Sequence, residues 1–353
     1  MKTKNTFQAI ILAVVLVITT SCNSNVNKET TTTTEVETTT EVKDPLPSWA
    51  EGKTKESIKS YVTDVTTEGS SNFIPVADRI ATFDNDGTLW SEQPAYFQLF
   101  FAISRIKDLA PEHPEWKNKQ PYKAVLENDM KSLMASGEKG LIEIVMTTHA
   151  GMTAEAFEKV VKDWFTKDTH PRFKKPFNTL IFQPMLELLD YLRANDFKTY
   201  IVSGGGVEFM RPWVEEAYGI PKEQVVGSSI KTEFVMENGK AQIKRLPAID
   251  FIDDKAGKPV GINKFIGKKP VFTAGNSDGD LQMMQYGDSN KYPSFQLYVH
   301  HTDAEREWAY DRESHIGQFN KGLDYATENG WTIIDMKKDW KVIYPFQLNE
   351  TKN

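Results

Sequence analysis

Four short apolar runs, each ending in a polar loop, constrain the fold of this 353-residue chain more than any other feature. They cover residues 80–83, 199–202, 271–274 and 295–299. Runs of this length are typical of strands that are buried on both faces, and helical patterns separate them. Strands that alternate with helices predict a parallel sheet covered by helices on both sides. We therefore expect an α/β fold with a Rossmann-like three-layer arrangement.

The segments between these runs predict helices and one hairpin. Apolar side chains before the second run follow i, i+3, i+4, i+7 spacing, which gives one helical stripe: Met185, Leu188, Leu189 and Leu192. Residues 53–65 predict a first helix. Between about 95 and 184 strand signals vanish while large apolar residues recur at helical spacing, which predicts an inserted α-helical cap over the end of the first strand. Asn238-Gly239 predicts a small β-hairpin over 230–244, an ornament on the sheet.

The N-terminus has the pattern of an export signal. Lys2 and Lys4 precede an apolar run over 9–18, and small residues then lead to the only cysteine, Cys22. Such a segment is typical of a secretory signal peptide and is too short to span a bilayer. We expect residues 1–22 to be a lipoprotein signal peptide and acylated Cys22 to anchor the protein to a membrane of the bacterial cell envelope, in the periplasm or outer membrane. Ordinary cleavage and release is the alternative.

Composition bounds the remaining organisation. Residues 23–47 are mostly Thr, Glu, Asn and Lys, so they predict a disordered tether. One cysteine permits no intrachain disulfide, and stability must come from packing. A net charge of −7 without a long basic tract argues against nucleic acid as a partner. We expect the core fold to occupy residues 48–94 and 185–353, with the cap at 95–184 between them.

The chemistry is expected at the carboxyl ends of the strands, where open α/β sheets bind ligands. The first loop contains Asp84 and Asp86, spaced by one residue, followed by Gly87. One carboxylate at such a position can attack an electrophile while the other moves protons. Gly87 permits the sharp turn that keeps both near one point.

These loops resemble the signatures of the haloacid dehalogenase superfamily of phosphohydrolases. Residues 83–89 resemble the first signature, and the serine-glycine turn at 201–206 resembles the second. Gly257-Lys258-Pro259 resembles the third, a lysine that opens a helix, and residues 275–280 resemble the fourth, an acidic loop. The resemblance covers roughly residues 80–299 apart from the cap. It is nearest to the phosphoserine-phosphatase-like branch with a helical cap, and so implies the core fold of that superfamily.

The resemblance implies a role for each matching residue. Asp84 would attack phosphorus and become an aspartyl phosphate, and Asp86 would act as acid and then as base. Ser203 would donate a hydrogen bond to the phosphoryl group, Gly204 and Gly205 would bind it through backbone amides, and Lys258 would offset negative charge. Lys255 and Lys264 compete with Lys258 for that last role.

A hard divalent cation is implied as well, and Mg²⁺ fits oxygen ligands. We expect the ligands to come from the Asp84 carboxylate, the Asp86 carbonyl and the fourth loop. That loop has Asn276 where many members of the superfamily have aspartate, with Asp280 four residues later. We expect Asn276 to be the ligand and Asp280 to support it; Asp278 is the alternative.

Several other residues have both a functional and a structural interpretation. His149, in the cap, would contact substrate or be an ordinary structural histidine. Arg211 would hold a second anionic group or pair with a surface carboxylate. Glu92, where the cap begins, is a similar case. His300 and His301 follow the last strand, and one of them is a candidate for lining the pocket.

The leading functional prediction is a Mg²⁺-dependent phosphomonoester hydrolase acting on a small exported or environmental phosphorylated metabolite. A dehalogenase would have no use for Asp86. A phosphomutase would need sugar bisphosphates, which are scarce outside the cytoplasm. From another class, a non-catalytic ligand-binding surface lipoprotein remains an alternative, because Asn276 weakens the expected metal site. The cap carries specificity in such proteins, and nothing in its sequence identifies the substrate.

Overall fold

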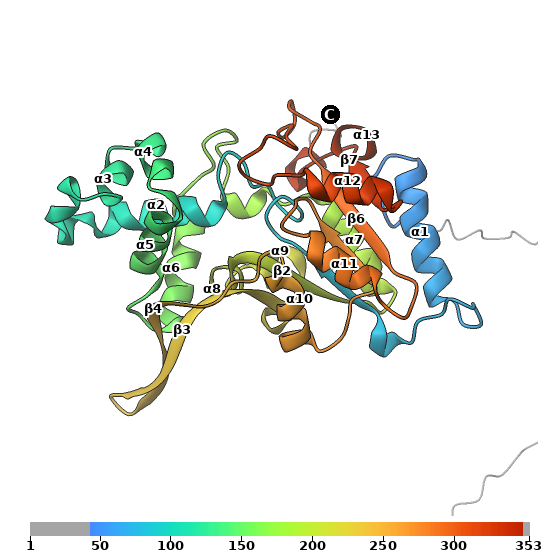
Figure 1. Ribbon diagram of the computed structural model, residues 1–353, viewed down its shortest axis with the longest axis horizontal. Helices are drawn as coiled ribbons and strands as arrows, with labels where there is room; N and C mark the ends of the chain where they lie inside the picture. The colour runs from blue at the N-terminus through green and yellow to red at the C-terminus, as the bar shows by residue number, and fades with distance from the viewer. Residues whose placement is uncertain (1–42, 349–353) are drawn as a thin grey trace, which may run out of the picture. The chain divides into compact units, whose positions relative to one another are not determined.

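A single seven-stranded sheet organises the protein, with the strand order β4-β3-β2-β1-β5-β6-β7 (Figure 1). The structure is a computed structural model and describes residues 43–348. All neighbouring strands run parallel except β3 and β4. The strands are β1 (Ile80–Phe83), β2 (Lys198–Gly206), β3 (Val225–Glu237), β4 (Lys240–Phe251), β5 (Phe272–Gly275), β6 (Phe295–His300) and β7 (Thr332–Asp335). The predicted α/β class is confirmed, and the four predicted strands correspond to β1, β2, β5 and β6.

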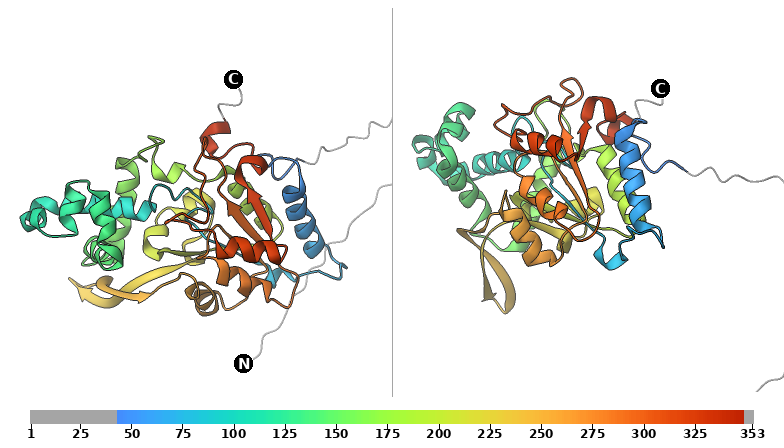
Figure 2. Two further views of the ribbon diagram at one scale, coloured as in Figure 1. Left: turned by 45° about the horizontal axis from the view of Figure 1, so that its top comes forward. Right: turned by 45° about the vertical axis from the view of Figure 1, so that its right-hand side comes forward.

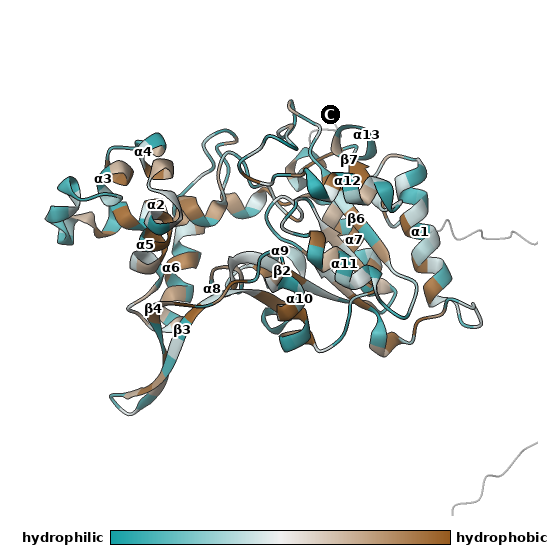
Figure 3. Cartoon of the chain, viewed as in Figure 1, coloured by the Kyte–Doolittle hydropathy of each residue, from teal (hydrophilic) through white to brown (hydrophobic). Residues whose placement is uncertain are grey.

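Helices cover both faces of the sheet (Figures 1 and 2). One face carries α1 (Lys53–Thr66) and α7 (Gln183–Ala194), and the other carries α10 (Gly257–Gly261), α11 (Leu281–Asp288) and α12 (Lys321–Glu328). Side chains alternate between the faces along each strand. On β2, Ile201 packs in the large core on the α7 side, whereas Val202 packs with Met283 of α11. Figure 3 shows the resulting apolar strands between polar outer helix surfaces.

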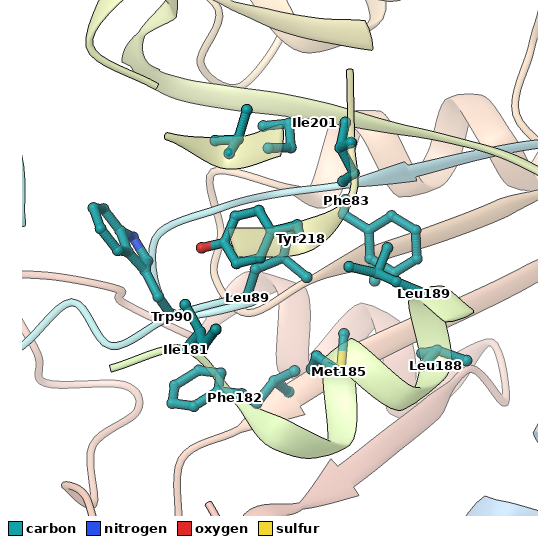
Figure 4. Close-up of a cluster of buried hydrophobic side chains, with 14 of the residues drawn as sticks. Phe83, Leu89, Trp90, Ile181, Phe182, Met185, Leu188, Leu189, Ile201 and Tyr218 are labelled. Carbon is teal, nitrogen blue, oxygen red and sulfur yellow. The ribbon is translucent and has the colours of Figure 1, made fainter. Parts of the chain in front are cut away.

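The predicted stripe on α7 forms part of this large core. Met185, Leu188, Leu189 and Leu192 are all buried. Figure 4 shows the first three close to Phe83 of β1. Burying a leucine-sized side chain stabilises the fold by about 1.5–3 kcal/mol. This stripe therefore fixes α7 beneath the strand that leads into Asp84.

Five α-helices lie between β1 and α7. They are α2 (Phe97–Leu109), α3 (Tyr122–Leu126), α4 (Met130–Ala135), α5 (Gly137–His149) and α6 (Ala154–Lys167). We call residues 95–184 the helical insertion. It has a small core of its own around Ile106, Trp116 and Leu133. Phe157 and Trp164 of α6, in contrast, join the large core of the sheet. The insertion is thus continuous with the rest of the fold along α6.

The hairpin is longer than predicted and has a structural role. It spans β3 and β4, from Val225 to Phe251, and turns at Asn238 and Gly239, both with positive φ. Its second strand pairs with the loop between α5 and α6. The Gly151 amide donates to the Arg245 carbonyl at 2.9 Å, and the Arg245 amide donates to Met152 at 3.0 Å. The hairpin is therefore not an ornament, because it ties the helical insertion to the sheet.

The remaining α-helices are short: α8 (Val207–Met210), α9 (Val214–Tyr218) and α13 (Met336–Asp339). The folded unit begins at Asp44, inside the predicted tether, and Leu46 is fully buried. The predicted signal peptide, Cys22 and most of the tether lie outside the described residues. No helix within residues 43–348 combines the length and apolar character that crossing a membrane requires.

Candidate active site

A cavity of about 740 Å³ opens at the carboxyl ends of β1, β2 and β5. Residues from all four loops singled out in the sequence line it. Those from the predicted site are Asp84, Asp86, His149, Ser203, Gly204, Gly205, Lys258 and Asp280. Parallel strands bring their carboxyl ends to one edge of a sheet, which is why loops so distant in sequence meet here.

The first loop turns sharply at Gly87, which has φ 73°. The Gly87 amide donates to the Trp90 carbonyl at 2.9 Å. A Cβ atom on Gly87 would lie 2.1 Å from Nδ2 of Asn276, so no other residue fits this position without rearrangement. The turn also lets the Trp90 indole donate to Oδ1 of Asp86 at 2.9 Å. Asp84 and Asp86 are consequently both held at the cavity.

Lys258 is the lysine that reaches the carboxylates. Its Nζ lies 2.7 Å from Oδ1 of Asp84 and 2.5 Å from Oδ1 of Asp280, and it donates to the Val202 carbonyl at 3.0 Å. Burial opposes its positive charge, but Asp280 and Asp84 outweigh that effect and hold its pKa above the ordinary value. The competing lysines, Lys255 and Lys264, are exposed.

Ser203 ends the regular pairing of β2, whose register with β3 shifts between Ser203 and Gly206. Its Oγ accepts a hydrogen bond from the Gly205 amide at 3.1 Å. The Gly206 amide donates to Oε1 of Gln98, from α2, at 2.8 Å. Two of the glycine amides of this turn are therefore already engaged within the protein. An oxyanion that approaches Gly205 would have to compete with the Ser203 hydroxyl.

His149 lines the cavity as a neutral ring. Its Nε2 lies 2.9 Å from the side-chain amide nitrogen of Gln98, and its Nδ1 lies 2.8 Å from Oγ1 of Thr148. An amide nitrogen can only donate, so Nε2 of His149 accepts and the ring proton sits on Nδ1. Burial, aided by the positive charge of Arg245, lowers the pKa of His149 to about 3. The ring is thus uncharged at any ordinary pH.

The structure does not bring every predicted residue to the cavity. Arg211 points its guanidinium at the backbone carbonyls of Lys222 and Val225, at 3.1 and 3.4 Å, and does not line the cavity. This placement gives no support to a role in anion binding. Asp278 accepts hydrogen bonds from the amides of Asn320 and Gly322 at the start of α12. That carboxylate therefore caps a helix, and the alternative metal ligand is not supported.

Neither His300, the last residue of β6, nor His301 lines the cavity. His301 is buried behind the first loop, where its Nε2 donates to the Gly87 carbonyl at 2.7 Å and its ring stacks on Tyr310 at 4.4 Å. His300 lies 3.4 Å from a carboxylate oxygen of Asp311. His301 thus supports the Gly87 turn from behind, a role that its place in the sequence did not indicate.

Glu92 is the residue whose importance the sequence left open. It is buried and lines the cavity. Its Oε1 accepts two hydrogen bonds at 2.7 Å, one from the side-chain Nδ2 of Asn276 and one from the hydroxyl of Tyr310. Burial and the negative charges of Asp86 and Asp84 raise its pKa well above the ordinary value. A carboxylate therefore stands directly beside the asparagine that replaces the expected aspartate.

Carboxyl groups outnumber positive groups at this end of the cavity. Asp84, Asp86, Glu92 and Asp280 face one ammonium group, that of Lys258. Burial raises the pKa of Asp86 to about 6, although the Trp90 hydrogen bond and Lys258 oppose the shift. Burial likewise raises the pKa of Asp84, and Lys258 only partly counters it. Uncompensated buried carboxylates of this kind favour a bound cation.

The donor set fits a hard divalent cation. The predicted ligands are all oxygens, from the Asp84 carboxylate, the Asp86 carbonyl and the Asn276 amide. Both carboxylate oxygens of Asp280 are engaged. Oδ1 contacts Lys258, and Oδ2 accepts hydrogen bonds at 3.0 Å from the backbone N–H groups of Asn276 and Ser277, so Asp280 positions the fourth loop. Within residues 43–348 no three His, Cys, Asp or Glu side chains gather as a metal cluster. A cation here would depend on the amide and carbonyl oxygens.

Comparison with solved structures gives several similar folds at low identity. A protein of unknown function from Bordetella pertussis Tohama I is 15% identical, with a TM-score of 0.45, over 73% of this chain and 99% of that one. A conserved protein of unknown function from Anaerococcus prevotii is 16% identical, with a TM-score of 0.46, over 79% and 90%. Phosphoserine phosphatase from T. onnurineus is 18% identical, with a TM-score of 0.30, over 64% and 86%.

Among curated proteins no match is found. The family model of haloacid dehalogenase-like hydrolases, in contrast, matches residues 81–285, more than half of the chain. This span begins in β1, contains all four loops of the cavity, and ends in α11. The chain therefore belongs to the haloacid dehalogenase-like hydrolase family.

Proposed function

We propose that the protein is a Mg²⁺-dependent phosphomonoester hydrolase that works through an aspartyl phosphate on Asp84. The observation that carries the proposal is the meeting of Asp84, Asp86, Ser203 and Lys258 at one cavity, with Lys258 Nζ 2.7 Å from Asp84. A nucleophile, a second carboxylate and a fixed positive charge are the parts that phosphoryl transfer requires. Phosphoserine phosphatase among the similar structures is compatible with this reaction.

In the first step Asp84 attacks phosphorus and the bond from phosphorus to the ester oxygen breaks. Lys258 holds Oδ1 of Asp84, while no hydrogen bond given by residues 43–348 occupies Oδ2, which leaves that oxygen available for attack. Asp86 gives its proton to the departing alcohol oxygen. Its raised pKa of about 6 suits an acid that must carry a proton near neutral pH.

In the second step Asp86 takes a proton from water, the water oxygen attacks phosphorus, and phosphate leaves with Asp84 restored. Ser203 donates its hydroxyl hydrogen to a phosphoryl oxygen, and Lys258 offsets charge on Asp84. A cation bound by Asp84, the Asp86 carbonyl and Asn276 would supply further positive charge beside the phosphoryl oxygens. Glu92 accepts a hydrogen bond from Nδ2 of Asn276 and so fixes the orientation of the asparagine side chain.

Metal removal tests the proposal directly. We expect the purified protein to release p-nitrophenol from p-nitrophenyl phosphate with Mg²⁺ present, and EDTA to lower the rate by at least about 100-fold. Added Mg²⁺ should restore the rate. Hydrolysis that EDTA leaves unchanged would contradict the metal requirement. Absence of hydrolysis with Mg²⁺ present would contradict the phosphatase assignment itself.

We also propose that the protein is exported and anchored in the cell envelope through Cys22. The proposal rests on the charged start, the apolar run over 9–18 and the small residues before the cysteine. Replacing Cys22 by serine should move the protein from the membrane fraction to the soluble fraction of a bacterial host. Ser24→Ala, two residues later, is a matched control that should leave the distribution unchanged. Equal distribution of wild type and Cys22→Ser would contradict the anchor.

A further inference from the structure

The cavity extends well beyond the catalytic carboxylates, and its outer part is apolar. One wall comes from α5, which directs Leu141, Ile142, Val145 and Met146 into the cavity. Ile142, Val145 and Met146 lie one, three or four residues apart and so share one face of the helix. Ile144 is buried in the small core of the insertion and Leu141 packs against its edge, whereas Ile142, Val145 and Met146 belong to neither that core nor the large core of the sheet.

The opposite wall belongs to the hairpin. Ile230 of β3 and Ile249 of β4 are directly paired across it, and Ile252 continues the same wall. Ile249 and Ile252 are 38% and 52% exposed, although both line a cavity. Figure 3 shows apolar segments on both α5 and this part of the hairpin. The favourable free energy of burying these apolar side chains is largest when one apolar group lies between the two walls and removes both from water.

The charged side chains that line the cavity leave no free positive group for a second anion of the substrate. Its basic side chains, within the described part of the chain, are Lys258 and Arg245. Lys258 is fully engaged by Asp84, Asp280 and a carbonyl. Arg245 forms an ion pair with Glu208, donates to the His149 carbonyl at 2.6 Å and lies 4.0 Å from the Phe157 ring. His149 is neutral, so no uncommitted positive group is available for a second anionic group.

We propose that the substrate is a phosphomonoester of an apolar alcohol, with an alkyl or aryl group lying between α5 and the hairpin. This inference rests on the proposed phosphatase function and adds the substrate class. A cavity of about 740 Å³ is large enough for a ligand of drug size, far more than a phosphate group needs. Asp254, which also lines it and forms no ion pair within residues 43–348, disfavours substrates with a carboxylate or a second phosphate.

A homologous series of esters tests the proposal. We expect kcat/KM to rise from ethyl to butyl to hexyl phosphate, by up to about fourfold for each added methylene. Hexyl phosphate should exceed ethyl phosphate by at least about tenfold on the same scale. O-phosphoserine, glucose 6-phosphate and phosphocholine should all be poorer substrates than hexyl phosphate. Phosphocholine separates a preference for apolar groups from attraction of a cation by the acidic lining.

Two matched variants locate the effect. Ile249→Asn should lower kcat/KM for hexyl phosphate by about fivefold, the scale expected when part of one apolar contact is lost, and should lower kcat/KM for ethyl phosphate by a smaller factor. Ile243→Asn is the control, because Ile243 is on the same strand and similarly exposed, at 40%, but does not line the cavity. It should change neither rate.

The outcomes separate this inference from the function on which it rests. If no phosphate ester is hydrolysed, the phosphatase proposal fails. If esters are hydrolysed but O-phosphoserine, glucose 6-phosphate or phosphocholine is preferred over hexyl phosphate, the apolar substrate class is wrong and the phosphatase stands. A preference for hexyl phosphate that Ile249→Asn leaves intact would also overturn the inference, because the alkyl group would then lie elsewhere.

Discussion

Asp84→Asn is expected to lower kcat by at least about 10⁴-fold, the scale seen when an enzyme loses its nucleophile. An amide has no negative charge to attack phosphorus, and it cannot form the acyl phosphate. Folding should survive, because Lys258 keeps its 2.5 Å contact with Asp280 when Asp84 becomes neutral. The measurement is p-nitrophenol release at saturating Mg²⁺, together with thermal unfolding of both proteins.

Asp108→Asn provides the matched control for this variant. Asp108 is an exposed aspartate on α2 that pairs with Lys167 and does not line the cavity. It should keep the wild-type rate, because exposed ion pairs contribute little. An Asp84→Asn protein that turns over within tenfold of wild type would show that another group attacks phosphorus.

Lys258→Met should cost both activity and stability. Methionine nearly preserves the volume of the side chain but removes the charge between Asp84 and Asp280. Removing one partner of a buried ion pair typically costs about 3–5 kcal/mol, because the remaining charges are left uncompensated. We expect a loss of that size in the free energy of unfolding, measured by urea denaturation without metal. We also expect kcat to fall by at least about 10³-fold, in line with losing electrostatic stabilisation of the transition state.

Lys255→Met separates this effect from the general cost of losing a lysine near α10. Lys255 is exposed and lies three residues before Lys258. Its φ is 51°, and the backbone strain there is the same for lysine and for methionine. Its replacement should leave unfolding and kcat close to wild type. If Lys258→Met unfolds at the same urea concentration as Lys255→Met, the ion pairs with Asp84 and Asp280 contribute nothing to stability.

The fold was predictable where the signal is local. Each parallel strand buried on both faces must be apolar throughout, so β1, β2, β5 and β6 stand out as short runs. β7 was missed because it lies at the edge of the sheet and three of its four residues are only partly buried. A short edge strand has no strong sequence pattern of its own, and β7 forms because its backbone pairs with β6.

The site was predictable as far as consecutive residues determine it. Asp84 and Asp86 follow β1, Ser203 lies in the last part of β2 and Lys258 in the first turn of α10. Each belongs to a short recognisable segment, and the sheet brings these segments together. The contact between Glu92 and Asn276, in contrast, joins residues 184 positions apart. The engagement of Arg211 by Lys222 and Val225 depends on tertiary packing in the same way. Such side-chain partnerships have no local pattern, so the sequence alone could not indicate them.

The pairing of β4 with the loop between α5 and α6 also limits how the helical insertion can move. The insertion is attached to the sheet by its two connecting chains, by the packing of α6 in the large core and by the hydrogen bonds between Arg245 and residues 151–152. It cannot swing about a single hinge without either breaking those bonds or carrying the hairpin with it. A movement of the insertion that keeps those bonds must therefore also bend β3 and β4, so a crosslink that stiffens the hairpin would restrict that movement from a distance.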